Sequence, residues 1–218
     1  MPIDAVVFDM DGVLLHSEEV WNASKEAVIR ENGGRWRDDA PRSMMGMSSA
    51  EWSRYMHDEL GVPLPPERID ELVVQRMRDT YEHALPLIPG ADEAVRRIAN
   101  RWPLAVASSS NRPIIDLALE LAGLDGCFQA TVSSEEVGRG KPAPDVYLEA
   151  AARLGADPRR CAAVEDSTNG ILSAHAAGMK VIAIPNPTYP PEPHGLDAAD
   201  VVLESIEQLT TEVVESLA

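Results

Sequence analysis

The sequence predicts an α/β fold, in which a parallel sheet carries helices on both faces and a helical segment is inserted after the first strand. Short apolar runs rich in Val and Ile alternate with amphipathic segments. This alternation is typical of buried parallel strands joined by crossover helices. The first apolar run is followed by about 95 residues without a convincing strand, far more than an ordinary crossover needs.

The predicted strands are short apolar runs bounded by polar or turn residues. Helices are predicted between the later runs, and Gly123, Gly155 and Gly178 follow three of them, as expected for the residue that most often terminates a helix. The strands are predicted over residues 3–8, 104–107, 128–132, 161–164, 181–184 and 201–203, and the helices over residues 92–100, 113–122, 143–154 and 167–177.

The long insertion is predicted to be helical. Residues 18–31, 50–60 and 67–84 show helical periodicity, and a Pro-containing linker at 85–90 leads back to the sheet. A single irregular domain is the less favoured alternative. We therefore expect a core domain of residues 1–16 and 89–218 and a separate helical domain of residues 17–88, and we expect the Pro-rich residues 185–193 to form a loop.

Composition excludes several classes of partner. The net charge of −17 repels nucleic-acid backbones, and no apolar run approaches the roughly 20 residues that cross a bilayer. The N-terminus lacks the basic segment of a signal peptide. Cys127 and Cys161 do not make a disulfide framework. We expect a soluble, cytoplasmic, monomeric protein without a nucleic-acid or membrane partner.

Two carboxylates follow the first predicted strand, in the sequence Asp9-Met-Asp11-Gly12. Residues two apart share one side of an extended strand, but a sharp turn at Gly12 lets the two carboxylates diverge. One can then bind Mg²⁺ and act as a nucleophile while the other transfers protons. Alone, the pair is weak evidence, because such acids also occur in turns and caps.

Hydroxyl groups follow the second predicted strand, in the run Ser108-Ser109-Ser110-Asn111. Hydroxyls and backbone N–H groups before a helix can hold an anion. Taken alone, an ordinary helix cap explains these residues equally well.

A lysine and two adjacent acids complete the set of polar clusters. Lys141 lies between a glycine and a proline and is one of three lysines beside sixteen arginines, so a compact charge sits on a fixed backbone. Glu165 and Asp166 end a buried strand, where adjacent acids are costly unless a cation such as Mg²⁺ pairs with them. For Lys141 the alternative is an ordinary surface lysine. For the two acids it is the capping of the helix that follows. Four clusters on successive strand ends are better explained by one ligand site.

In order and spacing, these clusters resemble the four motifs of the haloacid dehalogenase-like superfamily of phosphotransferases. The resemblance covers essentially the whole chain and is closest to the subfamily of β-phosphoglucomutases and phosphoglycolate phosphatases. It implies a Rossmann-like core with a central first strand and a helical cap inserted after the first motif, in agreement with the insertion predicted above.

The resemblance also implies a role for each motif residue. Asp9 would be the nucleophile that forms an aspartyl-phosphate, and Asp11 would be the general acid and then the general base. Ser108 would bind the transferred phosphoryl group, and Lys141 would bridge Asp9 and that group. The Mg²⁺ ligands would be Asp9, the backbone carbonyl of Asp11, Asp166 and, directly or through water, Glu165.

Substrate choice is less well defined by the sequence. The segment 45–51 resembles the subfamily's substrate loop, but Ser49 stands where the mutases have an arginine and Trp21 where they have a histidine. Both differences weaken the mutase interpretation. Arg42 and Arg54 are expected to be solvated helix residues rather than substrate ligands. The residues expected to contact phosphate or substrate are Gly12, Trp21, Ser49, Ser109, Ser110 and Asn111.

The expected function is a Mg²⁺-dependent phosphatase that hydrolyses a small phosphorylated metabolite, such as a sugar phosphate, through an aspartyl-phosphate. A phosphomutase of the β-phosphoglucomutase type is the alternative. A phospho-acceptor signalling domain uses similar residue types, but it has no room for a long insertion after the first strand. Asp11 argues against dehalogenation, because dehalogenases of this family do not use this second acid.

Overall fold

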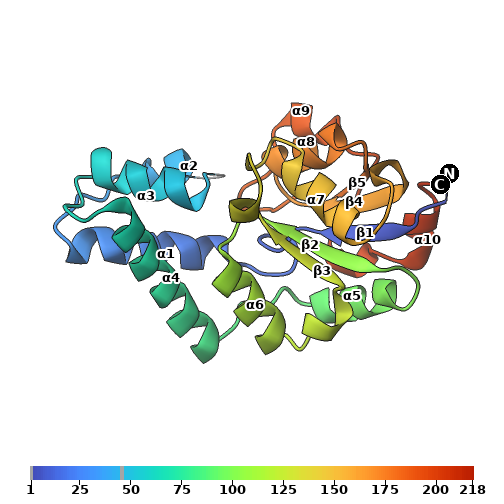
Figure 1. Cartoon of the computed structure of the whole chain (residues 1–218), viewed down its shortest axis with the longest axis horizontal. Coiled ribbons are helices and arrows are strands. Elements are labelled where there is room, and N and C mark those ends of the chain that lie inside the picture. Colours follow the sequence, from blue (N-terminus) through green and yellow to red (C-terminus); the bar gives the residue numbers. More distant parts are fainter. Residues whose placement is uncertain (1, 45–46) are drawn as a thin grey trace.

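The computed structural model describes residues 2–44 and 47–218 and confirms the α/β fold (Figure 1). Within these residues, six parallel strands form one sheet in the order β3-β2-β1-β4-β5-β6. The first strand is therefore central, with β2 on one side and β4 on the other. The strands are β1 (Ala5–Phe8), β2 (Leu104–Ser108), β3 (Ala130–Ser133), β4 (Cys161–Glu165), β5 (Lys180–Ala183) and β6 (Val201–Val202).

The helices fall into an inserted group and a group that covers the sheet. The inserted group comprises α1 (Glu18–Glu31), α2 (Ala40–Met44), α3 (Ser49–Asp58) and α4 (Pro66–His83). The group that covers the sheet comprises α5 (Ala91–Ala99), which also precedes β2, and α6 (Arg112–Leu121), α7 (Asp145–Arg153), α8 (Thr168–Ala176), α9 (Pro193–Leu196) and α10 (Thr211–Glu215).

Alternate residues of β1 pack on opposite faces of the sheet. Val6 belongs to a buried cluster with side chains of α5, α6 and α10, whereas Val7 belongs to a second cluster with side chains of α7 and α8. Both residues are fully buried. Because helices cover both faces, the strand is apolar along its whole length, and this produced the continuous apolar run seen in the sequence.

The helices α1 to α4 lie together beyond one end of the sheet, as expected for the insertion (Figure 1). Within this group α4 packs against α1 and α3, and it also contacts α6 of the sheet layer. The chain enters and leaves the group through two adjacent segments. Leu15 pairs with Leu87, and the backbone N–H of Ile88 donates a hydrogen bond to the carbonyl of Leu14 at 2.9 Å.

The predicted elements differ from the structure mainly at their ends and in the shortest helices. The helix expected over residues 143–154 begins at Asp145, because Pro144 occupies its N-cap position. The short helices α2, α9 and α10 were not predicted, since a helix of four or five residues is too short to show a 3.6-residue period. In the predicted substrate loop, Met45 and Gly46 lie outside the described residues. No helix in the described ranges is long and apolar enough to cross a membrane.

The central packing of the sheet gives a first testable prediction. Ile182 of β5 is fully buried, so we expect Ile182→Ala to lower the free energy of unfolding by about 2–5 kcal/mol through lost burial and a residual cavity. Leu148 of α7 is 41% exposed, and we expect Leu148→Ala to change stability by no more than about 0.5 kcal/mol. Urea unfolding followed by circular dichroism measures both. Equal losses would contradict this placement of the core.

Candidate active site

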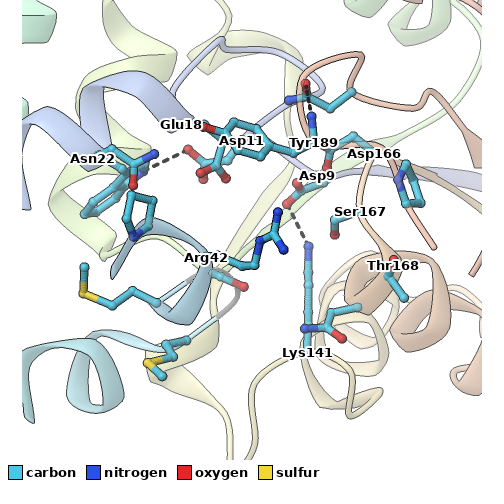
Figure 2. Close-up of a pocket in the computed structure, with 18 of the residues that line it drawn as sticks. Asp9, Asp11, Glu18, Asn22, Arg42, Lys141, Asp166, Ser167, Thr168 and Tyr189 are labelled. Carbon is cyan, nitrogen blue, oxygen red and sulfur yellow. Dashed lines mark hydrogen bonds and ion pairs between the residues drawn. The ribbon is translucent and has the colours of Figure 1, made fainter. Parts of the chain in front are cut away.

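Polar side chains that follow β1, β2 and β4 meet at one edge of the sheet, because the carboxyl ends of parallel strands lie together. They line a cavity of about 450 Å³ (Figure 2). Residues of α1, α2 and the loop before α9 line the same cavity. Of the residues expected from the sequence to act at the site, those that line it are Asp9, Asp11, Trp21, Ser109, Ser110, Lys141 and Asp166.

A buried lysine is shared between two carboxylates at this edge. The ammonium of Lys141 donates hydrogen bonds to Asp9 Oδ1 at 2.7 Å and to Glu165 Oε1 at 2.6 Å. Burial, the strongest influence, lowers the pKa of Lys141, but the two carboxylates outweigh it and raise that pKa above its usual value. Lys141 therefore carries a fixed positive charge beside Asp9.

Three buried acids form a group that could hold a metal ion. Carboxylate oxygens of Asp9, Glu165 and Asp166 all lie within 4.8 Å of one another. Burial raises the pKa of Asp9 and of Asp166 well above the usual range, and repulsion from Glu165 adds to this, while Lys141 offsets only part of it. Closely spaced carboxylate oxygens are the ligands that Mg²⁺ prefers. The residues present thus fit a divalent cation, whose charge would stabilise the ionised acids.

Two glycines make room for these acids. Gly12 has a φ of +82°, and a Cβ atom there would lie 1.9 Å from Asp166 Oδ2. A Cβ atom at Gly170 would lie 1.8 Å from Glu165 Oε1. The backbone can therefore approach each carboxylate only because both positions lack a side chain. Gly12 lies against Asp166, and the phosphate contact expected for it from the sequence stays a prediction.

Glu165 is held by donors on both of its oxygens. Besides Lys141, Oε1 accepts a hydrogen bond from the Tyr147 hydroxyl at 2.7 Å. Oε2 accepts from the backbone N–H of Asp166 at 3.1 Å and from the Ser167 hydroxyl at 3.3 Å. These bonds fix Glu165 as the support of both Lys141 and Asp166. Tyr147 was missed in the sequence because it lies within the apolar pattern of a predicted helix.

Asp11 points away from the acidic group and is held by separate donors. Its carboxylate accepts hydrogen bonds from the hydroxyls of Ser110 at 2.7 Å and Ser108 at 3.2 Å. The indole N–H of Trp21, on α1, donates to its other oxygen at 3.3 Å. Asp9 and Asp11 thus occupy different environments, which suits two different chemical roles. The metal contact expected for the backbone carbonyl of Asp11 stays a prediction.

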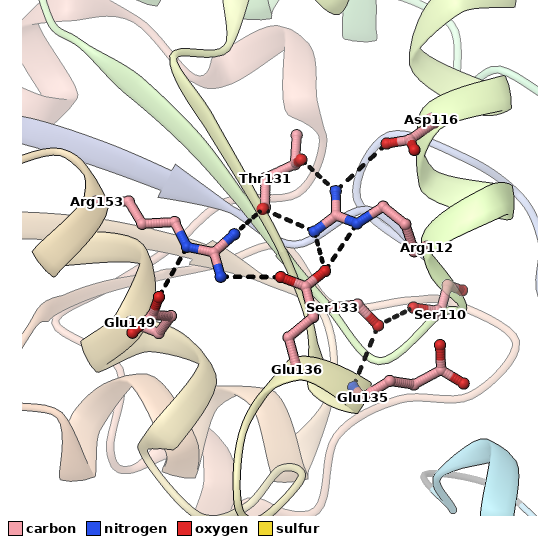
Figure 3. Close-up of polar contacts among 9 residues, drawn as sticks. All are labelled: Ser110, Arg112, Asp116, Thr131, Ser133, Glu135, Glu136, Glu149 and Arg153. Atoms are coloured by element: carbon pink, nitrogen blue, oxygen red, sulfur yellow. Dashed lines mark hydrogen bonds and ion pairs between the residues drawn. The ribbon is translucent and has the colours of Figure 1, made fainter.

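The loop that carries Ser110 is fixed from the neighbouring strand (Figure 3). The Ser133 hydroxyl, at the end of β3, donates a hydrogen bond to the Ser110 carbonyl at 2.7 Å. Close by in the chain, Glu136 accepts from Arg112 of α6 and from Arg153 of α7. The ends of β2 and β3 and both flanking helices are thereby joined beside the cavity.

Four residues expected to contact phosphate or substrate, Gly12, Ser49, Ser108 and Asn111, are not among the described residues that line the cavity. The side-chain amide of Asn111 donates hydrogen bonds to Asp70 of α4 at 3.1 Å and to Glu135 at 2.9 Å, so it joins the inserted helices to the sheet layer. Ser49 is buried at the start of α3, and its hydroxyl has no hydrogen-bond partner among the described residues.

Several lining residues were not expected from the sequence to act at the site. On α1 they share one helix face, and this spacing is the signal that could have identified them. Arg42 was expected to be solvated; it is exposed, and it also lines the cavity, with its side chain directed toward Asp9 (Figure 2). The others include Glu18, Asn22 and Lys25 of α1, Trp52 of α3, and Asn186, Tyr189, Glu192 and His194 in and before α9.

Comparison with known proteins gives consistent matches. A family model described as haloacid dehalogenase-like hydrolase matches residues 3–178. Hexitol phosphatase B of Escherichia coli (strain K12) is 34% identical over 212 residues, which cover 94% of each chain. A phosphorylated carbohydrates phosphatase of Thermotoga maritima is 29% identical over 83% of this chain and 84% of its own. The crystal structure of CbbY from Rhodobacter sphaeroides with phosphate superposes with a TM-score of 0.87 at 26% identity, covering 98% of this chain and 99% of that chain.

The close approach at Gly12 gives a prediction about metal binding. We expect added Mg²⁺ to raise the melting temperature of the wild-type protein, since a cation bound to the folded state stabilises it. In Gly12→Ala the new methyl group displaces Asp166, so this increase should be largely lost. Differential scanning calorimetry with and without MgCl₂ measures it.

Gly33→Ala is the matched control, because Gly33 has a φ of +81° and a methyl group added there would have no atom within 4 Å. Both variants lose roughly 1–2 kcal/mol of stability from the left-handed backbone. Only Gly12→Ala should lose the response to Mg²⁺. An undiminished response in Gly12→Ala would show that Asp166 is not a ligand.

Proposed function

This chain belongs to the haloacid dehalogenase-like hydrolases, and we propose that it is a Mg²⁺-dependent phosphatase that hydrolyses a small phosphorylated sugar through an aspartyl-phosphate. The main support is the pairing of a buried carboxylate, Asp9, with the ammonium of Lys141 at 2.7 Å, beside a second carboxylate, Asp11, in a different environment. The E. coli phosphatase that it resembles is named for hexitols and the T. maritima phosphatase for phosphorylated carbohydrates, which supports the substrate class.

Asp9 is the proposed nucleophile. A carboxylate oxygen of Asp9 donates an electron pair to phosphorus, and the bond from phosphorus to the leaving oxygen breaks. Lys141 holds Oδ1 in place and offsets the repulsion between the carboxylate and the phosphate dianion. Ser108 and Ser110 lie beside Asp11, where their hydroxyls can turn to the phosphoryl oxygens.

Asp9, Asp166 and Glu165 are the proposed metal-site residues, with Glu165 acting mainly through its hold on Lys141 and Asp166. When bound there, Mg²⁺ supplies neutralisation of the charge that builds up on the transferring phosphoryl group. The acidic group is otherwise short of positive charge, because Lys141 is the one buried cation that contacts it in the described part of the chain.

Asp11 is the proposed acid and base. As a carboxylic acid it protonates the leaving oxygen, which departs as an alcohol. The resulting carboxylate then takes a proton from water, whose oxygen attacks phosphorus and releases phosphate from Asp9. Trp21 and Ser110 position this carboxyl group from opposite sides of the cavity, one from the inserted helices and one from the sheet.

Residues 17–88 are the proposed cap domain, and residues 1–16 and 89–218 the proposed core domain. The pairing of Leu15 with Leu87, at the two crossings between these parts, supports this division. The core supplies the acids and Lys141, while α1 and α2 contribute the opposite wall of the cavity. A cap over the site excludes water and selects the leaving group.

We also propose that the protein acts in the cytoplasm as a monomer, without a nucleic-acid or membrane partner. The net charge of −17 supports the absence of a nucleic-acid partner. Free thiols at Cys127 and Cys161 support a reducing compartment.

The direct test is phosphate release by the purified protein. We expect hydrolysis of p-nitrophenyl phosphate and of sugar phosphates in the presence of MgCl₂, and loss of both activities with EDTA.

The phosphomutase alternative is tested with β-glucose 1-phosphate and a bisphosphate primer. Efficient isomerisation without phosphate release would overturn the phosphatase proposal in favour of a mutase.

Substitution of the nucleophile gives the sharpest prediction. We expect Asp9→Asn to abolish turnover, because an amide cannot form the aspartyl-phosphate, while the melting temperature stays within a few degrees of wild type. Asp4→Asn is the matched control, since Asp4 precedes the same strand and pairs with Arg160 rather than with the site. It should retain activity. Near-wild-type turnover by Asp9→Asn would disprove the assignment of Asp9.

A further inference from the structure

A buried ammonium in the inserted helices faces the same cavity as the catalytic acids. Lys25 of α1 is 7% exposed and lines the cavity, and its Nζ lies 5.3 Å from the centre of the Trp21 ring and 5.1 Å from that of the Trp52 ring. Among the described residues it forms neither a hydrogen bond nor an ion pair. A buried cation without acceptors is costly, and two aromatic faces offset only part of that cost. The remaining acceptors are expected to come from a ligand.

The residues around Lys25 form a mixed set of donors and acceptors. Glu18, Trp21, Asn22 and Lys25 are spaced as i, i+3, i+4 and i+7, so they share one face of α1, and all of them line the cavity. Glu18 accepts hydrogen bonds, Lys25 donates them, and Asn22 does both. Hydroxyl groups also do both, so a chain of hydroxyls matches this set.

We propose that Lys25 determines substrate specificity by donating hydrogen bonds to hydroxyl oxygens of the leaving group, an uncharged sugar or polyol chain that packs its carbon side against Trp21 and Trp52. This proposal rests on the proposed phosphatase function and assigns its leaving-group site. The phosphoryl group lies at Asp9 and the hydroxylated chain extends toward α1.

The charges that line the cavity argue against a second anionic group. Among the described residues that line it, three are lysines or arginines, whereas five carry carboxylates. The phosphoryl group already brings negative charge into this space, so a second phosphate or a carboxylate on the substrate would be repelled by Glu18 and Asp11. The cations are Lys25, Arg42 and Lys141, and the acids are Asp9, Asp11, Glu18, Asp166 and Glu192.

The protonation of Lys25 is consistent with a donor role. Burial lowers the pKa of Lys25 to about 8, while Glu18 and Asp11 act in the opposite direction. At pH 7 the side chain is therefore mostly protonated and can donate to hydroxyl oxygens. Burial likewise raises the pKa of Glu18.

The test compares two leaving groups in one enzyme. The ratio of kcat/KM for a hexitol 6-phosphate to kcat/KM for p-nitrophenyl phosphate, which has no hydroxyl chain, is measured in MgCl₂ for the wild type and for Lys25→Met. We expect this ratio to fall about tenfold or more, the size expected for a lost charged hydrogen bond. Lys180→Met is the matched control: Lys180 pairs with Asp200 away from the cavity and its side chain is 43% exposed, so the ratio should stay as in the wild type.

An unchanged ratio in Lys25→Met would overturn the proposal, and so would a larger loss on 3-phosphoglycerate than on the hexitol phosphate, since the ligand of Lys25 would then be an anion. If Lys25→Met fails to fold, Lys25→Gln is measured in the same way, with a smaller fall expected. Absence of p-nitrophenyl phosphate turnover in the wild type would count against the phosphatase function instead.

A binding measurement tests Lys25 without turnover. In Asp9→Asn, tryptophan fluorescence is titrated with hexitol 6-phosphate, because Trp21 and Trp52 flank the proposed site. We expect a fluorescence change, with a Kd about tenfold or more higher when Lys25→Met is added. Equal Kd values for the two proteins, or no fluorescence change, would overturn the role of Lys25 even if the protein were not a phosphatase.

Discussion

The ammonium of Lys141 is the interaction on which the arrangement of the site depends. Three carboxylates are buried at the end of a parallel sheet, where unpaired charges cost several kcal/mol each. Lys141 contacts two of them, Asp9 and Glu165, and Glu165 in turn holds the backbone of Asp166. The acids can therefore stay close together before any cation arrives. Because three carboxylates share one ammonium group, negative charge remains in excess. This excess makes the site suitable for a divalent cation.

The side chains of the site come from two parts of the structure, the ends of the strands and the inserted helices. The strand ends bring the acids, the serines and Lys141 together, while α1 faces them with a mixed set of polar and aromatic side chains. Asp11 stands at the boundary, since it accepts hydrogen bonds from Ser110 on one side and Trp21 on the other. The position of the proposed acid thus depends on both parts. A shift of the inserted helices relative to the sheet would therefore change the surroundings of Asp11 more than those of Asp9.

How much the sequence predicts depends on where a residue lies in the topology. Asp9, Lys141 and Asp166 could be placed together because parallel strands end at the same edge, so local position in the chain was enough. Asn111 follows the serines directly, yet its amide turns to Asp70, a partner in the inserted helices that no local pattern reveals. Lys25 could not be placed for the same reason. Its surroundings depend on how α1 packs against α3, and helix packing angles are set by side-chain contacts that periodicity does not encode.

The pairing of Leu15 with Leu87 has an evolutionary consequence. Because the two ends of the inserted segment lie side by side, the segment is attached to the rest of the chain, its host, at one place. The entropic cost of closing a loop of this kind grows only slowly with its length. All strand pairs of the described sheet lie outside the segment between these positions, so its register is set by residues of the host. Under the proposed division into core and cap, the inserted helices are attached to the core at this one junction. A different helical segment placed at this junction would lie over the same acids and the same lysine, but it would present different side chains to the substrate.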